Sequence, residues 1–155
     1  MRKAITVLVL VLASLLVAAP PVVARAKTAA AAERRVLRLV NAARAQSGCA
    51  PLRISPQISR AARHQARDLI RNDRYSHTGS DGSTPGGRIR RVGYRWHLAG
   101  ENLFLGPRDA QEAVRGWLRS PEHRANILNC SYRHTGVAVQ GPPSHRLWVQ
   151  DFAAP

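Results

Sequence analysis

The sequence is poor in cysteine, aromatic residues and acidic residues. Of its 155 residues only 2 are Cys, 5% are aromatic, and 9 Asp and Glu stand against 24 Lys and Arg. No Gly-x-Ser-x-Gly segment is present, so we do not expect a serine hydrolase that uses this nucleophile turn. The arginines are scattered without interleaved aromatic residues, and a nucleic-acid partner is therefore not expected.

The beginning of the chain has the features of a signal peptide. A basic start precedes an apolar run over residues 4–19, and Ala24-Arg25-Ala26 forms a small-x-small cleavage motif. The run is short for a membrane helix, which needs about 20 residues, and no Cys follows it for lipid attachment. An uncleaved N-terminal anchor is the alternative. We predict a secreted protein with a signal peptide over 1–26, a disordered lead-in over 27–32 and one domain over 33–155.

The predicted mature chain is strongly basic. The segment 1–26 holds three cations and no acid, which leaves 21 Lys and Arg against 9 Asp and Glu. Such a charge favours contact with an anionic cell-wall polymer or an acidic lipid surface. The alternative is that the arginine excess reflects only the composition of the source genome and keeps the protein soluble.

The two cysteines, Cys49 and Cys130, remain in a chain that we expect to be exported. Export favours oxidation, and a disulfide between them closes a loop of about 80 residues, worth ~4 kcal/mol by chain entropy. The alternative is a pair of free or metal-binding thiols, although the sequence offers no further soft ligand nearby.

Hydrophobic periodicity predicts an α+β fold, with helices packed on a mainly antiparallel sheet. Ser55-Pro56 and Asp109 are start signals for two of the helices. The predicted helices cover 32–46, a segment from Ser55 to about 70, 84–93, 109–118 and a short turn after Ser120-Pro121. The predicted strands cover 100–105, 134–140 and 146–152, the last two as an antiparallel hairpin.

Three short segments carry the chemistry. They are Tyr75-Ser76-His77-Thr78-Gly79, Ala99-Gly100-Glu101-Asn102-Leu103, and the segment from Trp117 to Leu128 that contains Ser120-Pro121-Glu122-His123. In this order, with Leu39-Val40-Asn41 before them and Gly136-Val137-Ala138-Val139 after them, they resemble the CAP superfamily. These SCP domains include the cysteine-rich secretory, antigen five and plant pathogenesis-related proteins. The similarity to the compact bacterial branch runs from Val36 to Phe152 and implies a three-layer α-β-α sandwich.

The resemblance also implies that His77, Glu101 and His123 face a common cavity. For each there is a simpler interpretation: His77 as a helix C-terminal cap, Glu101 as a surface acid, and His123 as a residue at a helix start. If the three converge, the carboxylate raises the pKa of a neighbouring imidazole. The helix N-terminus disfavours a charged His123.

The chain departs from the family pattern at one position. Many members carry a second acid where this chain has Ser120, so Ser120 and Glu122 are secondary candidates for the cavity. His77, His123 and Glu101 match the ligand types of an open Zn²⁺ site. Their spacing does not support a metal motif, so no cofactor is required and only weak binding of Zn²⁺ or another divalent metal is considered.

Three functions remain open at this point. The first is a monomeric, non-enzymatic extracellular protein that binds a lipid-like, glycan or protein ligand in the His/Glu cavity. The second is an extracellular hydrolase assisted by a metal or by the His/Glu pair. The third is a cationic binder of cell-wall polymer or membrane surface with a vestigial cavity.

Overall fold

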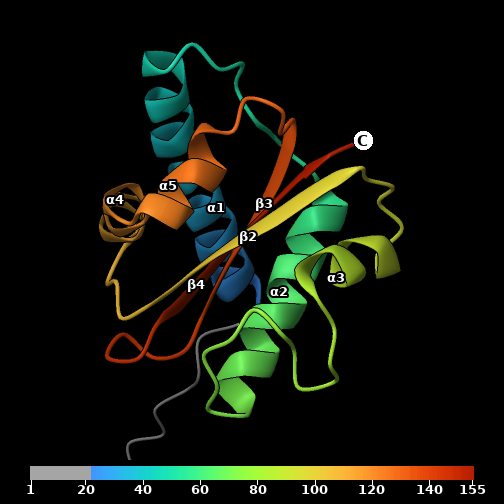
Figure 1. Cartoon of the computed structure of the whole chain (residues 1–155). Helices are drawn as coiled ribbons and strands as arrows, with labels where there is room; N and C mark the ends of the chain where they lie inside the picture. The colour runs from blue at the N-terminus through green and yellow to red at the C-terminus, as the bar shows by residue number, and fades with distance from the viewer. Residues whose placement is uncertain (1–21) are drawn as a thin grey trace, which may run out of the picture.

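The computed structural model describes residues 22–155 and shows a four-stranded sheet between two layers of helices (Figure 1). One layer consists of α1 (Val22–Gln46), α4 (Ala110–Arg119) and α5 (Pro121–Leu128). The other consists of α2 (Pro56–Arg71) and α3 (Pro85–Arg91). The predicted three-layer α-β-α sandwich is confirmed.

The sheet is mostly antiparallel, with the strand order β1-β3-β4-β2. The strands are β1 (Arg53–Ile54), β2 (Leu98–Leu105), β3 (His134–Gln140) and β4 (Leu147–Ala154). β4 pairs antiparallel with both β2 and β3, which confirms the predicted hairpin, whereas β1 runs parallel to β3. The sequence analysis missed β1, because two residues are too few to show an alternating pattern.

The predicted helix starts are confirmed by their hydrogen bonds. The Ser55 hydroxyl accepts from the Ile58 N–H, with Pro56 in the first turn of α2. The Asp109 carboxylate accepts from the N–H groups of Gln111 and Glu112 at 2.8 and 2.9 Å. Each cap satisfies amide groups that the helix itself leaves without partners.

The first helix begins earlier than predicted. Residues 27–32, which the sequence analysis assigns to a disordered lead-in, are helical and belong to α1. The correction has a simple cause: this segment is rich in alanine, the residue with the highest helix propensity. Most of the predicted signal peptide, residues 1–21, lies outside the described residues. Among residues 22–155 no helix is long and apolar enough to cross a membrane.

The two faces of the sheet carry separate cores, and β2 contributes to both. Leu103 packs with Ala62 and Leu69 of α2, whereas Phe104 packs beneath α1 and α4 against a cluster that includes Trp117. Side chains alternate along a strand, so Glu101 lies on the α2 and α3 side of the sheet. This alternation sets the position of the site described below.

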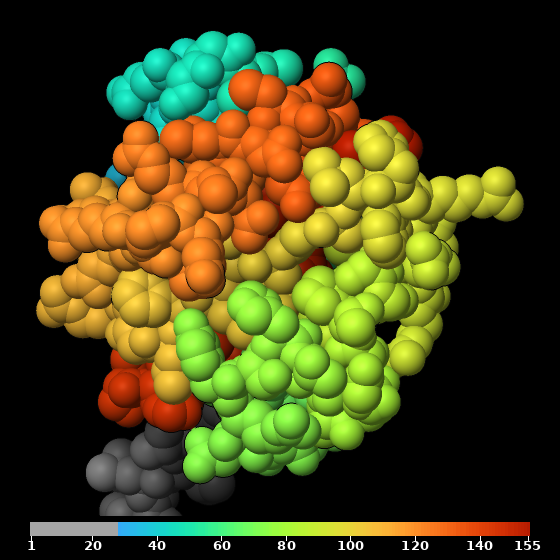
Figure 2. All heavy atoms as spheres, viewed as in Figure 1, coloured from blue at the N-terminus to red at the C-terminus, as the bar shows by residue number. Residues whose placement is uncertain are grey.

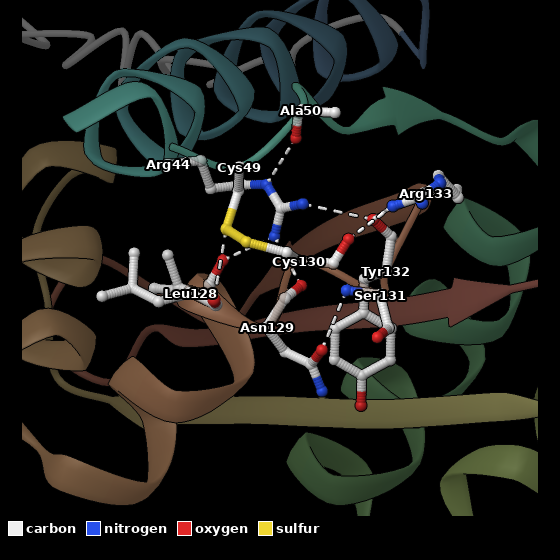
Figure 3. Close-up of a disulfide and its surroundings, with 10 residues drawn as sticks. Arg44, Cys49, Ala50, Leu128, Asn129, Cys130, Ser131, Tyr132 and Arg133 are labelled. Atoms are coloured by element: carbon white, nitrogen blue, oxygen red, sulfur yellow. Dashed lines mark hydrogen bonds between the residues drawn. A yellow bond between two sulfur atoms is a disulfide. The ribbon is translucent and has the colours of Figure 1, made fainter. Parts of the chain in front are cut away.

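The predicted disulfide joins Cys49 and Cys130 (Figure 3). Beside it lies Arg44, fully buried, whose guanidinium donates to four backbone carbonyl groups at 2.8–3.2 Å. The acceptors are the carbonyls of Ala50, Ile127, Asn129 and Tyr132. The disulfide and Arg44 together fasten the end of α1 to the segment between α5 and β3.

Candidate functional site

Glu101 is the centre of the candidate site. Its side chain is 1% exposed, and its two carboxylate oxygens have different partners. His77 Nδ1 donates to Oε1 at 2.8 Å, and Arg88 Nη2 donates to Oε2 at 2.6 Å. A buried carboxylate is costly unless it is paired, and here both oxygens are paired.

Arg88 comes from the middle of α3 and is itself buried, 1% exposed. Its Nη1 donates to the Ser83 carbonyl at 2.8 Å, and its Nη2 also donates to the His77 carbonyl at 3.1 Å. The guanidinium therefore holds both Glu101 and the backbone of the segment that carries His77. Arg88 was not predicted as a site residue from the sequence, because the partner of a buried charge depends on the tertiary fold.

His77 lies beyond the end of α2, which is capped by Asn72. It is therefore not the helix cap that the simpler interpretation predicts. The Gln65 amide donates to the Ser76 carbonyl at 2.9 Å and fixes the preceding residue. The hydrogen bond to Glu101 raises the pKa of His77, and partial burial opposes this shift. The His77 side chain is 54% exposed, so an imidazole with a raised pKa faces solvent above a buried carboxylate.

His123 occupies the third position of α5, as predicted from Ser120-Pro121. Its carbonyl accepts from the Asn102 amide at 3.0 Å, which ties α5 to the strand residue next to Glu101. The pKa of His123 is lowered by burial and then by the charge of His77. The predicted neutral imidazole is thus favoured, mainly through burial. The two histidines have shifts of opposite sign.

The secondary candidates differ from each other. The Glu122 carboxylate is exposed, yet its charge raises the pKa of both His77 and His123. Ser120 links α4 to α5, and its side chain makes no capping hydrogen bond. Glu122 therefore contributes to the electrostatics of the site, whereas in the described part of the chain no hydrogen bond joins the Ser120 side chain to His77 or Glu101.

Asp151 is a second buried carboxyl group that the sequence analysis missed. It is fully buried on β4, directly opposite Glu101 in the strand register. Burial raises the pKa of Asp151 well above its ordinary value, the charge of Glu101 raises it further, and Arg88 opposes the shift. Both cationic partners, His77 and Arg88, pair with Glu101, and in the described part of the chain Asp151 forms no ion pair.

The residues do not fit a metal centre well. Within residues 22–155 no group of three or more His, Cys, Asp or Glu side chains is arranged to hold a metal ion. The set considered from the sequence, His77, His123 and Glu101, is therefore not assembled as ligands. The reason lies in the donor set, because both oxygens of Glu101 already accept from Arg88 and His77.

The surface is hollowed where three segments meet. Figure 2 shows a furrow between the orange atoms around α5 and the green atoms that precede α3, with β2 in yellow beside it. The neighbouring hollow of about 630 Å³ is lined by Arg88 but not by His77, Glu101 or His123.

Comparison with known proteins places the sequence in a family. The model of the CAP family, described as the cysteine-rich secretory protein family, matches residues 37–152. YkwD from Bacillus subtilis is 32% identical over 120 residues, which cover 77% of this chain and 46% of that protein. The chain spans less than half the length of the curated relatives that it matches.

Solved structures show the same fold. An extracellular protein with an SCP domain from Bacillus anthracis is similar with a TM-score of 0.79 and 27% identity, over 89% of this chain and 45% of that chain. An outer surface protein from Borrelia burgdorferi gives a TM-score of 0.72 at 23% identity, over 78% of this chain and 90% of that chain.

Proposed function

Because the chain belongs to the CAP family over residues 37–152, we propose that it is a secreted, non-enzymatic binding protein whose site contains His77, Glu101 and His123. Secretion by a cleaved signal peptide over 1–26 is part of this proposal. It is supported by the composition of that segment and by the similarity to an extracellular protein of Bacillus anthracis.

One observation carries the binding proposal: the Glu101 carboxylate is held at both oxygens and cannot be reached without breaking a buried ion pair. A carboxylate fixed in this way suits the positioning of His77 better than attack or proton transfer. The exposed surface then consists of His77, whose pKa is raised, His123, whose pKa is lowered, and the Glu122 carboxylate. These groups can donate to and accept from a polar ligand, which favours the polar parts of a glycan, a protein or a lipid-like molecule.

The test is binding of extracellular ligands to three variants. The Glu101→Gln substitution keeps the shape of the side chain but removes the negative charge that holds His77, so we expect clearly weaker ligand binding. His77→Ala is expected to act in the same direction. His145→Ala is the matched control, because the His145 side chain is exposed and pairs only with Asp73, at 3.9 Å. Equal affinities for all variants and the wild type would refute a binding role for this site.

A hydrolase is the second candidate, and one observation favours it. The pKa of His77 is raised while that of His123 is lowered, which is the separation that an acid and a base require. Turnover of peptide and cell-wall substrates separates the two functions. We expect the wild type, His77→Ala and Glu101→Ala to share the same background rate. A rate that falls in either variant would establish the hydrolase.

We also propose that divalent metal ions bind this site only weakly. A metal ion at Glu101 has to displace His77 or Arg88 from a buried carboxylate, which costs the buried ion pair. Titration of the wild type with Zn²⁺, followed by the ring signals of His77 and His123, tests this. Tight binding at equimolar Zn²⁺ would contradict it.

A further inference from the structure

The solvent-facing side of α2 consists largely of arginine. Arg60, Arg63, Arg67 and Arg71 follow one another at intervals of three or four residues, with His64 among them. This spacing places neighbouring side chains on one side of a helix, about 5–6 Å apart. The opposite side of α2 is buried against the sheet. The helix therefore presents a row of cations to solvent over about 16 Å of its length.

This row borders a groove between α2 and α3, two helices that lie side by side (Figure 1). The groove has a volume of about 630 Å³. Its α3 side is formed by Arg88, Arg91 and Val92, and its lining holds no Phe, Tyr or Trp and a single acid, Asp68. It is a concave surface with six arginines and one acid.

The acids near the groove do not neutralise this row. Asp68 accepts from the Ser80 N–H at 2.8 Å, the Ser80 hydroxyl and the Asn72 amide. Asp81 pairs with Arg91 at 2.7 Å, and Glu101 pairs with Arg88. In the described part of the chain, Arg63, Arg67 and Arg71 therefore have no ion-pair partner.

We propose that this groove, lined by Arg60, Arg63, Arg67 and Arg71, is a second binding site, for a linear polyanion that carries phosphate groups. The arginine fork matches phosphate oxygens in a bidentate way. A row of forks along a helix suits a chain of repeated anions better than one compact ion. The lining holds no Phe, Tyr or Trp to act as a stacking platform for nucleic-acid bases, which favours a polyanion without bases. A concave surface also fits a single polymer chain better than a flat bilayer.

The site is separate from the surface around His77, although Arg88 borders both. It lies within the CAP domain, and its function does not depend on the ligand of the His77 site. The two proposals can therefore be refuted separately. A protein that does not bind a polyanion in the groove can still bind a ligand at the His77 site, and a protein that binds no ligand at the His77 site can still bind a polyanion in the groove.

The test uses inorganic polyphosphate as the probe and the full mature chain. Arg63→Gln/Arg67→Gln removes two charges from the groove. Arg34→Gln/Arg38→Gln removes two exposed charges at the same four-residue spacing on α1, and is the matched control. We expect the groove variant to lose about tenfold or more in affinity at low salt, and the slope of log K against log salt to fall by about two. We expect the control variant and His77→Ala to bind nearly as the wild type does.

The following results would overturn or support the polyanion proposal. Equal losses in the two double variants would mean that net charge alone attracts polyphosphate, and would overturn the proposal. Tighter binding of oligothymidylate than of polyphosphate at equal phosphate count would overturn it in favour of nucleic acid, and tighter binding of anionic vesicles in favour of a membrane surface. Arg71→Gln alone, an exposed change at the end of α2, serves as a second variant and is expected to lower the slope by about one.

Discussion

Glu101 and Asp151 lie directly opposite each other on β2 and β4, and both carboxyl groups are buried. Arg88 neutralises Glu101 at 2.6 Å, and in the described part of the chain neither Asp151 oxygen forms an ion pair. A buried carboxyl group without an ion-pair partner disfavours its charged form. Burial, and then the charge of Glu101, therefore raise the pKa of Asp151, and this has a consequence for stability.

Asp151→Asn is expected to stabilise the protein at neutral pH. The folded pKa of Asp151 is raised, so the stability that its proton confers is complete below the unfolded pKa and is lost as pH rises towards the folded pKa. Asparagine keeps the shape and does not titrate. Thermal unfolding is therefore expected to show a higher Tm for the variant at pH 7–8 and a shrinking difference towards pH 4. A variant that is less stable at every pH would contradict a raised pKa of Asp151.

Arg44→Met is expected to destabilise the fold by about 3 kcal/mol or more, because it leaves buried carbonyl groups without their donor. Four carbonyls lose their hydrogen bonds in this variant. Denaturant unfolding measures the loss. Arg38→Met, at an exposed position of the same helix, is the control and is expected to change stability by less than about 0.5 kcal/mol.

Removal of the disulfide by Cys49→Ser/Cys130→Ser is expected to cost about 2–5 kcal/mol. The bridge joins residues that are 81 positions apart, so its loss enlarges the conformational freedom of the unfolded chain. Unfolding in denaturant, compared with the native oxidised protein, gives the difference. Two titratable thiols in the native protein would show that the bridge is absent.

Local signals in the sequence predicted most elements of the fold. Ser55-Pro56 and Asp109 fixed the starts of α2 and α4, and the alternation of β3 gave its bounds correctly. These features depend on neighbours within a few residues. The early start of α1 and the two-residue strand β1 were not predicted, because an alanine-rich segment and a very short strand carry little periodic signal.

The buried charges could not be assigned a partner from the sequence. Arg88, Asp151 and Arg44 each depend on residues that are distant in the chain. For two of these residues the local sequence nevertheless contains a signal of burial. Arg44 continues the four-residue spacing of the buried Val36 and Val40, and Asp151 interrupts an apolar strand. A charge at a position that the periodicity assigns to the core is a signal of a buried ion pair or hydrogen-bond network.

The prediction that His77, Glu101 and His123 share one site came from the order of the sequence motifs and not from hydrophobic periodicity. The structure places His77 against Glu101, and the pKa of His123 is lowered by burial and then by the charge of His77. For His77 the raised pKa adds stability below its unfolded pKa that is lost as pH rises through the folded value. For His123 the sign is reversed, and stability is lost as pH falls through its lowered pKa.

The most direct test of the account is an NMR pH titration of the ring nitrogens of His77 and His123 in the wild type and in Glu101→Gln. We expect His77 to titrate above the ordinary histidine value of about 6.5 and His123 below it, and we expect the pKa of His77 to fall in the variant. The same pKa for both imidazoles, unchanged by Glu101→Gln, would show that the three residues do not form one site.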